Sequence, residues 1–229
     1  MQKTQRELYL EVLQKLKQEG VLEDIVLIGS WCGQLYREYF KDDKYVPVIR
    51  TRDVDFLVPI PVKIKRQVDL QQILSDLGFN IVFKGRDGYI SFEHPDLIIE
   101  FLVPERGRDS DKPYAIPKLG INAQPLRHLD LLSEKTVKIS FGGVEVVAPH
   151  PANFALQKLL ISGRRTKVEK AEKDRALAFE ILKALIEAGD GASVTACYRR
   201  LPKKWQKNIL AVVEQSEWAE MLSGLLAVE

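Results

Sequence analysis

The sequence predicts an α/β fold of the α+β type, in which a mixed α/β part is followed by a helical part. Two observations predict this order. Before residue 149, short apolar runs typical of strands alternate with segments whose apolar residues recur at helical spacing. From Pro151 onward the helical period continues to the end of the chain, and proline suits the first position of a helix. We therefore expect two domains, over residues 1–148 and 149–229.

The elements expected before the boundary follow from these patterns. A first helix, which ends at Gly20, carries one apolar stripe made of Leu8, Val12, Leu13 and Leu16. After it we expect a buried strand at 24–30, a helix at 31–40, a strand within 50–59, a helix at 68–79, an antiparallel meander over 80–104 and a hairpin over 135–149. Residues 104–125 are rich in Pro, Gly and charge, so we expect them to be mostly irregular.

The second part should contain helices at 152–162 and about 167–188, then two or three shorter ones.

Composition points to a soluble, cytoplasmic protein. No apolar run approaches the roughly 20 residues that span a bilayer, and charges interrupt the N-terminal segment as they would not in a signal peptide. The two cysteines, Cys32 and Cys197, have no metal-ligand spacing and suit a reducing compartment. The 34 basic and 32 acidic side chains nearly cancel, so bulk charge does not indicate a nucleic-acid binder.

Two aspartates interrupt the expected strand in "RTRDVDFLVP" (50–59). Asp53 and Asp55 are two residues apart, so both side chains project from the same face, about 6.6 Å apart along the strand. Two carboxylates this close need a compensating cation, because like charges raise each other's pKa and buried uncompensated ions are costly. A pair of Mg²⁺ ions fits the reach of these oxygens.

A third acid, Glu100, interrupts another apolar strand, "LIIEFLVP". If that strand lies beside the first, three carboxylates converge. An acid at a strand edge or in a turn is the alternative interpretation of each of them.

The strand "DIVLIGS" (24–30) ends in Gly29 and Ser30, just before an expected helix. Backbone N–H groups and a hydroxyl at a helix N-terminus favour phosphate, although ordinary N-capping gives the same pattern. The Walker lysine of a P-loop is missing from this turn.

Together, "LIGS", "RDVDFLV" and "IIEFL" resemble the DNA polymerase β-like nucleotidyltransferase superfamily. The later "PHPANFALQKLLISGRRTKVEKAEKD" is similar to a helical segment of its small bacterial branch, which includes abortive-infection toxins. The resemblance implies a mixed-sheet nucleotidyltransferase fold over 1–148 with a C-terminal helical domain over 149–229. It also implies a metal-dependent, pyrophosphate-releasing enzyme that moves an NMP group from an NTP to a hydroxyl acceptor.

By the same resemblance, Asp53, Asp55 and Glu100 would be the catalytic, metal-holding acids, and Gly29 and Ser30 would bind the triphosphate. The implied cofactor is Mg²⁺, as two ions, with Mn²⁺ as an alternative. ATP is one candidate NTP, and the acceptor stays open among RNA such as a tRNA 3′ end, a protein hydroxyl and a small molecule. The alternative is a non-catalytic member of the fold that binds an NTP or a partner.

Charges on inward stripes of the helical part suggest a further nucleotide contact. We predict that Lys158 reaches the triphosphate and is oriented by Asp174, while a buried Lys158–Asp174 ion pair is the alternative. We expect Arg164 and Arg165 to be solvated. The basic segment "RRLPKKWQK" (199–207) carries Trp205, which suits RNA contact, although a solvated helix face has the same composition.

Overall fold

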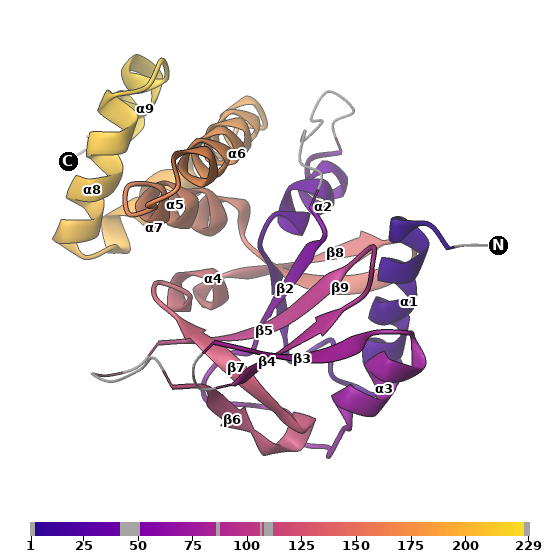
Figure 1. The fold of residues 1–229 in the computed structure, drawn as a ribbon. Helices are drawn as coiled ribbons and strands as arrows, with labels where there is room; N and C mark the ends of the chain where they lie inside the picture. Colours follow the sequence, from indigo (N-terminus) through magenta and orange to yellow (C-terminus); the bar gives the residue numbers. More distant parts are fainter. Residues whose placement is uncertain (1–2, 42–50, 86–87, 106, 108–111, 227–229) are drawn as a thin grey trace. The chain divides into compact units, whose positions relative to one another are not determined.

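The structure is a computed structural model, and it describes residues 3–41, 51–85, 88–105, 107 and 112–226 (Figure 1). The chain divides into two compact units, one from residues 1–38 and 48–149 and the other from 39–47 and 150–229. Within the described residues, no helix combines the length and apolar character that crossing a membrane requires. The expected division into a catalytic domain over 1–148 and a C-terminal helical domain over 149–229 stays a prediction.

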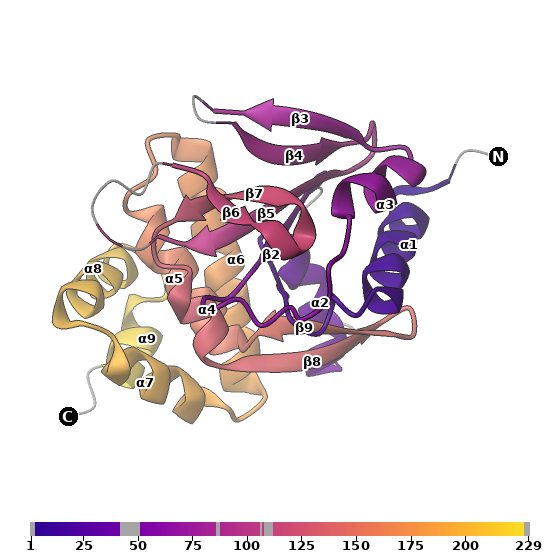
Figure 2. The same cartoon turned by 90° about the horizontal axis from the view of Figure 1, so that it is seen from below.

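A mixed sheet forms the centre of the first unit, as the α/β assignment requires. Its strands are β1 (Val26–Ile28), β2 (Asp53–Leu57), β3 (Asn80–Lys84), β4 (Tyr89–Glu93), β5 (Ile98–Pro104), β6 (Tyr114–Ile116) and β7 (Ile121–Leu126). The main order is β1-β2-β5-β4-β3, with β7 beside β5 and β6 beside β7. The pairs β2–β5 and β5–β7 are parallel and the others are antiparallel, so the predicted meander β3-β4-β5 is confirmed. Figure 2 shows β3 and β4 side by side at one edge.

Part of the stretch expected to be irregular is ordered as strands. Within 104–125, β6 pairs with β7, and β7 adds to β5 in parallel register at Leu102↔Gln124. A 3₁₀ turn, η1 (Pro117–Leu119), and Gly120 at a φ of 64° connect the two strands. The expectation was wrong here because pairing with a distant strand, rather than local composition, decides the structure.

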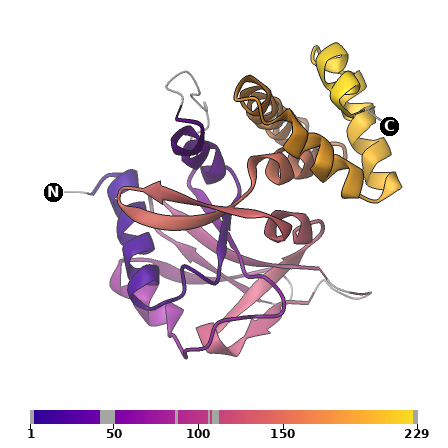
Figure 3. The same ribbon diagram turned by 180° about the vertical axis from the view of Figure 1, so that it is seen from behind.

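The first unit also contains helices α1 (Gln5–Gln18), α3 (Leu70–Asp76) and α4 (Asp130–Glu134), together with α2 (Trp31–Phe40) except for its last two residues. A separate hairpin of β8 (Thr136–Phe141) and β9 (Val144–Pro149) packs against α1 and β1 (Figure 3). Thr4 and Glu7 form a capping box that starts α1, and the apolar stripe of this helix is buried. Rings of Tyr9, Trp31 and Phe141 meet in the core between these elements.

The second unit is helical in its described part from Pro151 onward. Its helices are α5 (Pro151–Ser162), α6 (Val168–Glu187), α7 (Gly191–Arg200), α8 (Lys203–Glu214) and α9 (Ala219–Leu226). His150 caps α5 by accepting a hydrogen bond from the Ala152 N–H through Nδ1, with Pro151 at the first helical position as predicted. Helix α5 is buried over almost its whole length and packs against α6, α7 and α8.

Candidate active site

The two aspartates of β2 lie on one face of the sheet, as strand alternation requires. Val54 and Phe56 are fully buried on the opposite face, where Phe56 stacks on Phe101 of β5 with ring centroids 5.6 Å apart. Asp53 is exposed and Asp55 is half-buried. The apolar side chains of β2 therefore pack in the core, and its two carboxylates lie on the opposite face of the sheet.

Glu100 lies directly beside this pair, because β5 is the parallel neighbour of β2. The register pairs Asp55 with Glu100 and Asp53 with Ile98. Paired residues on adjacent strands point to the same face, at a strand spacing of about 4.8 Å. The strand contact expected between the two interrupted strands is thus present, and it brings Asp55 and Glu100 next to each other.

Gly29 closes the same site from the other side of β2. Strand β1 pairs antiparallel with β2, with Ile28 opposite Asp55, so the turn after β1 passes directly over the Asp55 carboxyl group. Gly29 has a φ of +74°, and a Cβ built on it would overlap Oδ2 of Asp55 and lie 3.1 Å from Cγ. Only glycine fits both the backbone conformation and the close approach. Ser30 follows immediately, ahead of α2.

A lysine that our sequence-based reasoning did not identify also lies at this face. Lys84 ends β3, and its Nζ donates to Oε1 of Glu100 at 3.1 Å and lies 2.9 Å from Oε1 of Glu93. Partial burial lowers the pKa of Lys84, but hydrogen bonds and charges from Glu93 and Glu100 outweigh it and raise that pKa above its ordinary value. No sequence signal marked Lys84, because a lysine ending a strand is ordinarily solvated.

Ser91 of β4 lies between these groups. The ladders place it opposite both Glu100 and Val82, and its side chain is fully buried. Its Oγ has no hydrogen-bond partner among the described residues. A buried hydroxyl beside a carboxylate is a ready donor if that carboxylate changes its conformation.

The donor set fits a divalent metal in chemistry and in register. Carboxylate oxygens are the ligands that Mg²⁺ prefers, and Asp53, Asp55 and Glu100 share one face of two neighbouring strands. In the part of the chain that the structure describes, no three His, Cys, Asp or Glu side chains are grouped closely enough to hold an ion. The ion pair to Lys84 engages Glu100 as the side chains stand.

In the helical unit, Lys158 forms a buried ion pair with Asp174. Its Nζ lies 2.7 Å from Oδ1, and each side chain is 9% exposed. Arg165, which we expected to be solvated, binds the other oxygen of Asp174 through Nε at 2.9 Å and is 39% exposed. One carboxylate therefore holds two cations, and the contact of Lys158 with a triphosphate stays a prediction.

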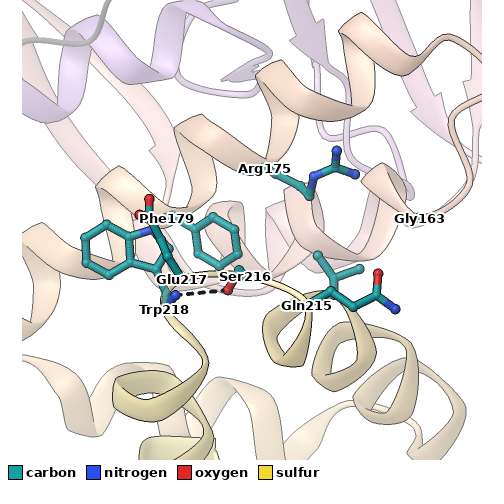
Figure 4. Close-up of a pocket in the computed structure, with 8 residues that line it drawn as sticks. Gly163, Arg175, Phe179, Gln215, Ser216, Glu217 and Trp218 are labelled. Carbon is teal, nitrogen blue, oxygen red and sulfur yellow. Dashed lines mark hydrogen bonds between the residues drawn. The ribbon is translucent and has the colours of Figure 1, made fainter.

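The helical unit also has a pocket of ≈ 470 Å³ that contains none of the predicted site residues. Figure 4 shows Arg175 and Phe179 of α6 on one side and Gln215–Trp218, after α8, on the other. The Phe179 and Trp218 rings stack with centroids 6.4 Å apart. In the basic segment 199–207, the five bases are exposed and Trp205 is half-buried, and RNA contact there stays a prediction.

Comparison with known proteins gives a family and a fold. A family model described as nucleotidyltransferase matches residues 7–201. A nucleotidyltransferase-like protein of Paracoccidioides brasiliensis has a similar structure, with a TM-score of 0.52 and 16% identity, over 98% of this chain and 93% of that one. The antibiotic-resistance factor ANT(2″)-Ia is also similar, with a TM-score of 0.50 and 12% identity, over 85% of this chain and 91% of that one. No protein of curated function matches the sequence.

Proposed function

The chain belongs to the nucleotidyltransferase family, and on that basis we propose that it moves an NMP group from an NTP to a hydroxyl acceptor at the face that carries Asp53, Asp55 and Glu100. The observation that carries the proposal is the register of β2 and β5. It sets Asp55 beside Glu100, directly under the Gly29 turn. A sheet that needed these strands only for its core would have no use for three carboxylates on one face.

In this proposal each group has a separate task. Asp53, Asp55 and Glu100 would hold divalent cations, which supply charge neutralisation for the triphosphate and the leaving pyrophosphate. The Gly29 backbone and the Ser30 hydroxyl orient the triphosphate from the N-terminus of α2. The acceptor oxygen attacks the α-phosphorus, one of the three carboxylates takes its proton, and the bond to the β-phosphate oxygen breaks. Most of the acceleration then comes from positioning and charge stabilisation.

The acceptor is a hydroxyl on RNA, on a protein or on a small molecule. The fold that the chain shares with an antibiotic-resistance factor supports a small-molecule acceptor, and the exposed bases of 199–207 support RNA. We propose Mg²⁺ as the resident metal, with Mn²⁺ as the alternative, because the donors are hard oxygen ligands.

The test is transfer from each of four α-labelled NTPs, with Mg²⁺ or Mn²⁺, to cell RNA, cell protein and a panel of hydroxylated metabolites. Asp53→Asn and Asp55→Asn should each abolish labelling while leaving the fold intact, because each substitution removes a charge and hardly changes volume. Asp76→Asn, at an exposed helix position, is the matched control and should label normally. Undiminished labelling by Asp55→Asn would contradict the proposed site.

A further inference from the structure

We infer that Lys84 is a built-in counter-cation of the metal site: it pairs with both Glu100 and Glu93 while no metal is bound and stays paired with Glu93 alone when Glu100 turns to a metal. The inference rests on the proposed function, since it assumes that Glu100 is a metal ligand. Lys84 lies between two carboxylates, with Nζ 3.1 Å from Oε1 of Glu100 and 2.9 Å from Oε1 of Glu93.

The strand ladders keep these three residues on the face that carries Asp55. Lys84 is opposite Tyr89, Glu93 lies four residues further along β4, and Glu100 is opposite Ser91 between them. Because Asp55 is paired with Glu100 on the other side, the Glu100 carboxylate has an acidic neighbour on β2 and a cation from β3. A partly buried carboxylate beside another acid requires such a cation.

The lysine also explains the side-chain arrangement at the site. Three acids share the face, yet no three-ligand group exists among the described residues, and Glu100 is paired with Lys84. A metal that recruits Glu100 must therefore compete with the ammonium group of Lys84. Glu93 makes this exchange less costly because it already accepts from Lys84 and retains the cation after Glu100 leaves.

Ser91 offers Glu100 a second partner for the new position. Its Oγ is fully buried and has no partner in the described structure, and it faces the same side of the sheet as Glu100. A hydroxyl there can donate to the oxygen of Glu100 that Lys84 has released.

The experiment is Mn²⁺ binding to the whole chain, measured by electron paramagnetic resonance of free Mn²⁺ and by calorimetry, without nucleotide. Lys84→Met should tighten binding by about two- to fivefold, the size expected for one partly exposed ion pair. Lys138→Met is the matched control: Lys138 is also a strand lysine in an ion pair, with Glu145, and its loss should leave binding unchanged.

Two double variants separate the exchange from a general effect of charge. In the Glu100→Gln background Lys84→Met should have no effect, because the lysine acts through Glu100. Glu93→Gln should weaken binding in the natural chain, since Lys84 then stays on Glu100, but should have little effect once Lys84 is methionine. Additive effects in either pair would overturn the inference.

The two proposals fail differently. If Asp55→Asn and Glu100→Gln each weaken Mn²⁺ binding measurably but Lys84→Met matches the natural protein, the metal site stands and the role of Lys84 is wrong. If the natural protein does not bind Mn²⁺, or binds it independently of these acids, both proposals are wrong.

Discussion

Replacing Lys158 by methionine tests how one carboxylate supports two cations in the helical unit. Methionine keeps the unbranched, apolar part of the lysine side chain, and its thioether replaces the ammonium group that lies 5.5 Å from the centroid of the Phe154 ring. The change therefore removes mainly the charge and its hydrogen bond to Asp174, which is 2.7 Å long.

The size of the effect depends on Arg165. Stranding a buried charge typically costs about 3–5 kcal/mol. Asp174 keeps the Arg165 guanidinium, however, with Nε 2.9 Å from Oδ2, so it is not stranded. We therefore expect Lys158→Met to cost only the charge-assisted hydrogen bond, ~2 kcal/mol, which for a chain of this length lowers the melting temperature by about 4–8 °C. Adding Arg165→Gln should raise the loss to the full ~3–5 kcal/mol.

Urea unfolding and hydrogen exchange of peptides from α5 and α6 measure these losses, and the exchange rates locate them in the helical unit. Lys158→Met with Asp174→Leu should recover most of the stability, because no buried carboxylate remains. NTP binding to Lys158→Met is measured in parallel. If Lys158 contacts the triphosphate, its loss should weaken NTP binding, whatever the change in unfolding free energy. If the single change cost as much as the change at both Lys158 and Arg165, the compensating role of Arg165 would be refuted.

Two further predictions concern the turn after β1. Gly29→Ala should abolish transfer, since its Cβ would overlap the Asp55 carboxyl group. Gly20→Ala is the control: it has the same kind of backbone strain, at a φ of +69°, but no atom within 4 Å of the added Cβ, so it should stay active. Labelled-NTP transfer compares the two variants, and an active Gly29→Ala would contradict the geometry. Ser30→Ala should weaken NTP–Mg²⁺ binding about tenfold, the loss of one hydrogen bond to a charged group; equilibrium dialysis measures it, and unchanged affinity would place the triphosphate elsewhere.

The candidate acids could be predicted from the sequence because the patterns that mark them lie within single strands. Alternation decides that Asp53 and Asp55 share a face, and an acid within an apolar run marks Glu100 without knowledge of the rest of the chain. The meander between β3 and β5 also follows from neighbouring segments and their turns.

What the sequence did not predict depends on contacts between distant segments. Strand β7 exists because it can pair in parallel with β5, and its own proline- and glycine-rich surroundings gave no sign of this. Lys84 and Arg165 gain their partners only after folding, through a strand ladder and through the packing of α5 on α6. Composition alone makes both look like ordinary solvated bases.

The length of chain between the Gly29–Ser30 turn and the strand that carries Asp53 and Asp55 does not decide how close they lie. Twenty-two residues separate Ser30 from Asp53. The distance between the Gly29 turn and the Asp55 carboxyl group is nevertheless fixed by the antiparallel ladder that sets Ile28 opposite Asp55, and not by the chain that connects them. The intervening residues can therefore vary in number while the turn and the acid stay in contact. For the same reason, Gly29 and Asp55 act as one element of the site: a side chain at the first displaces the second.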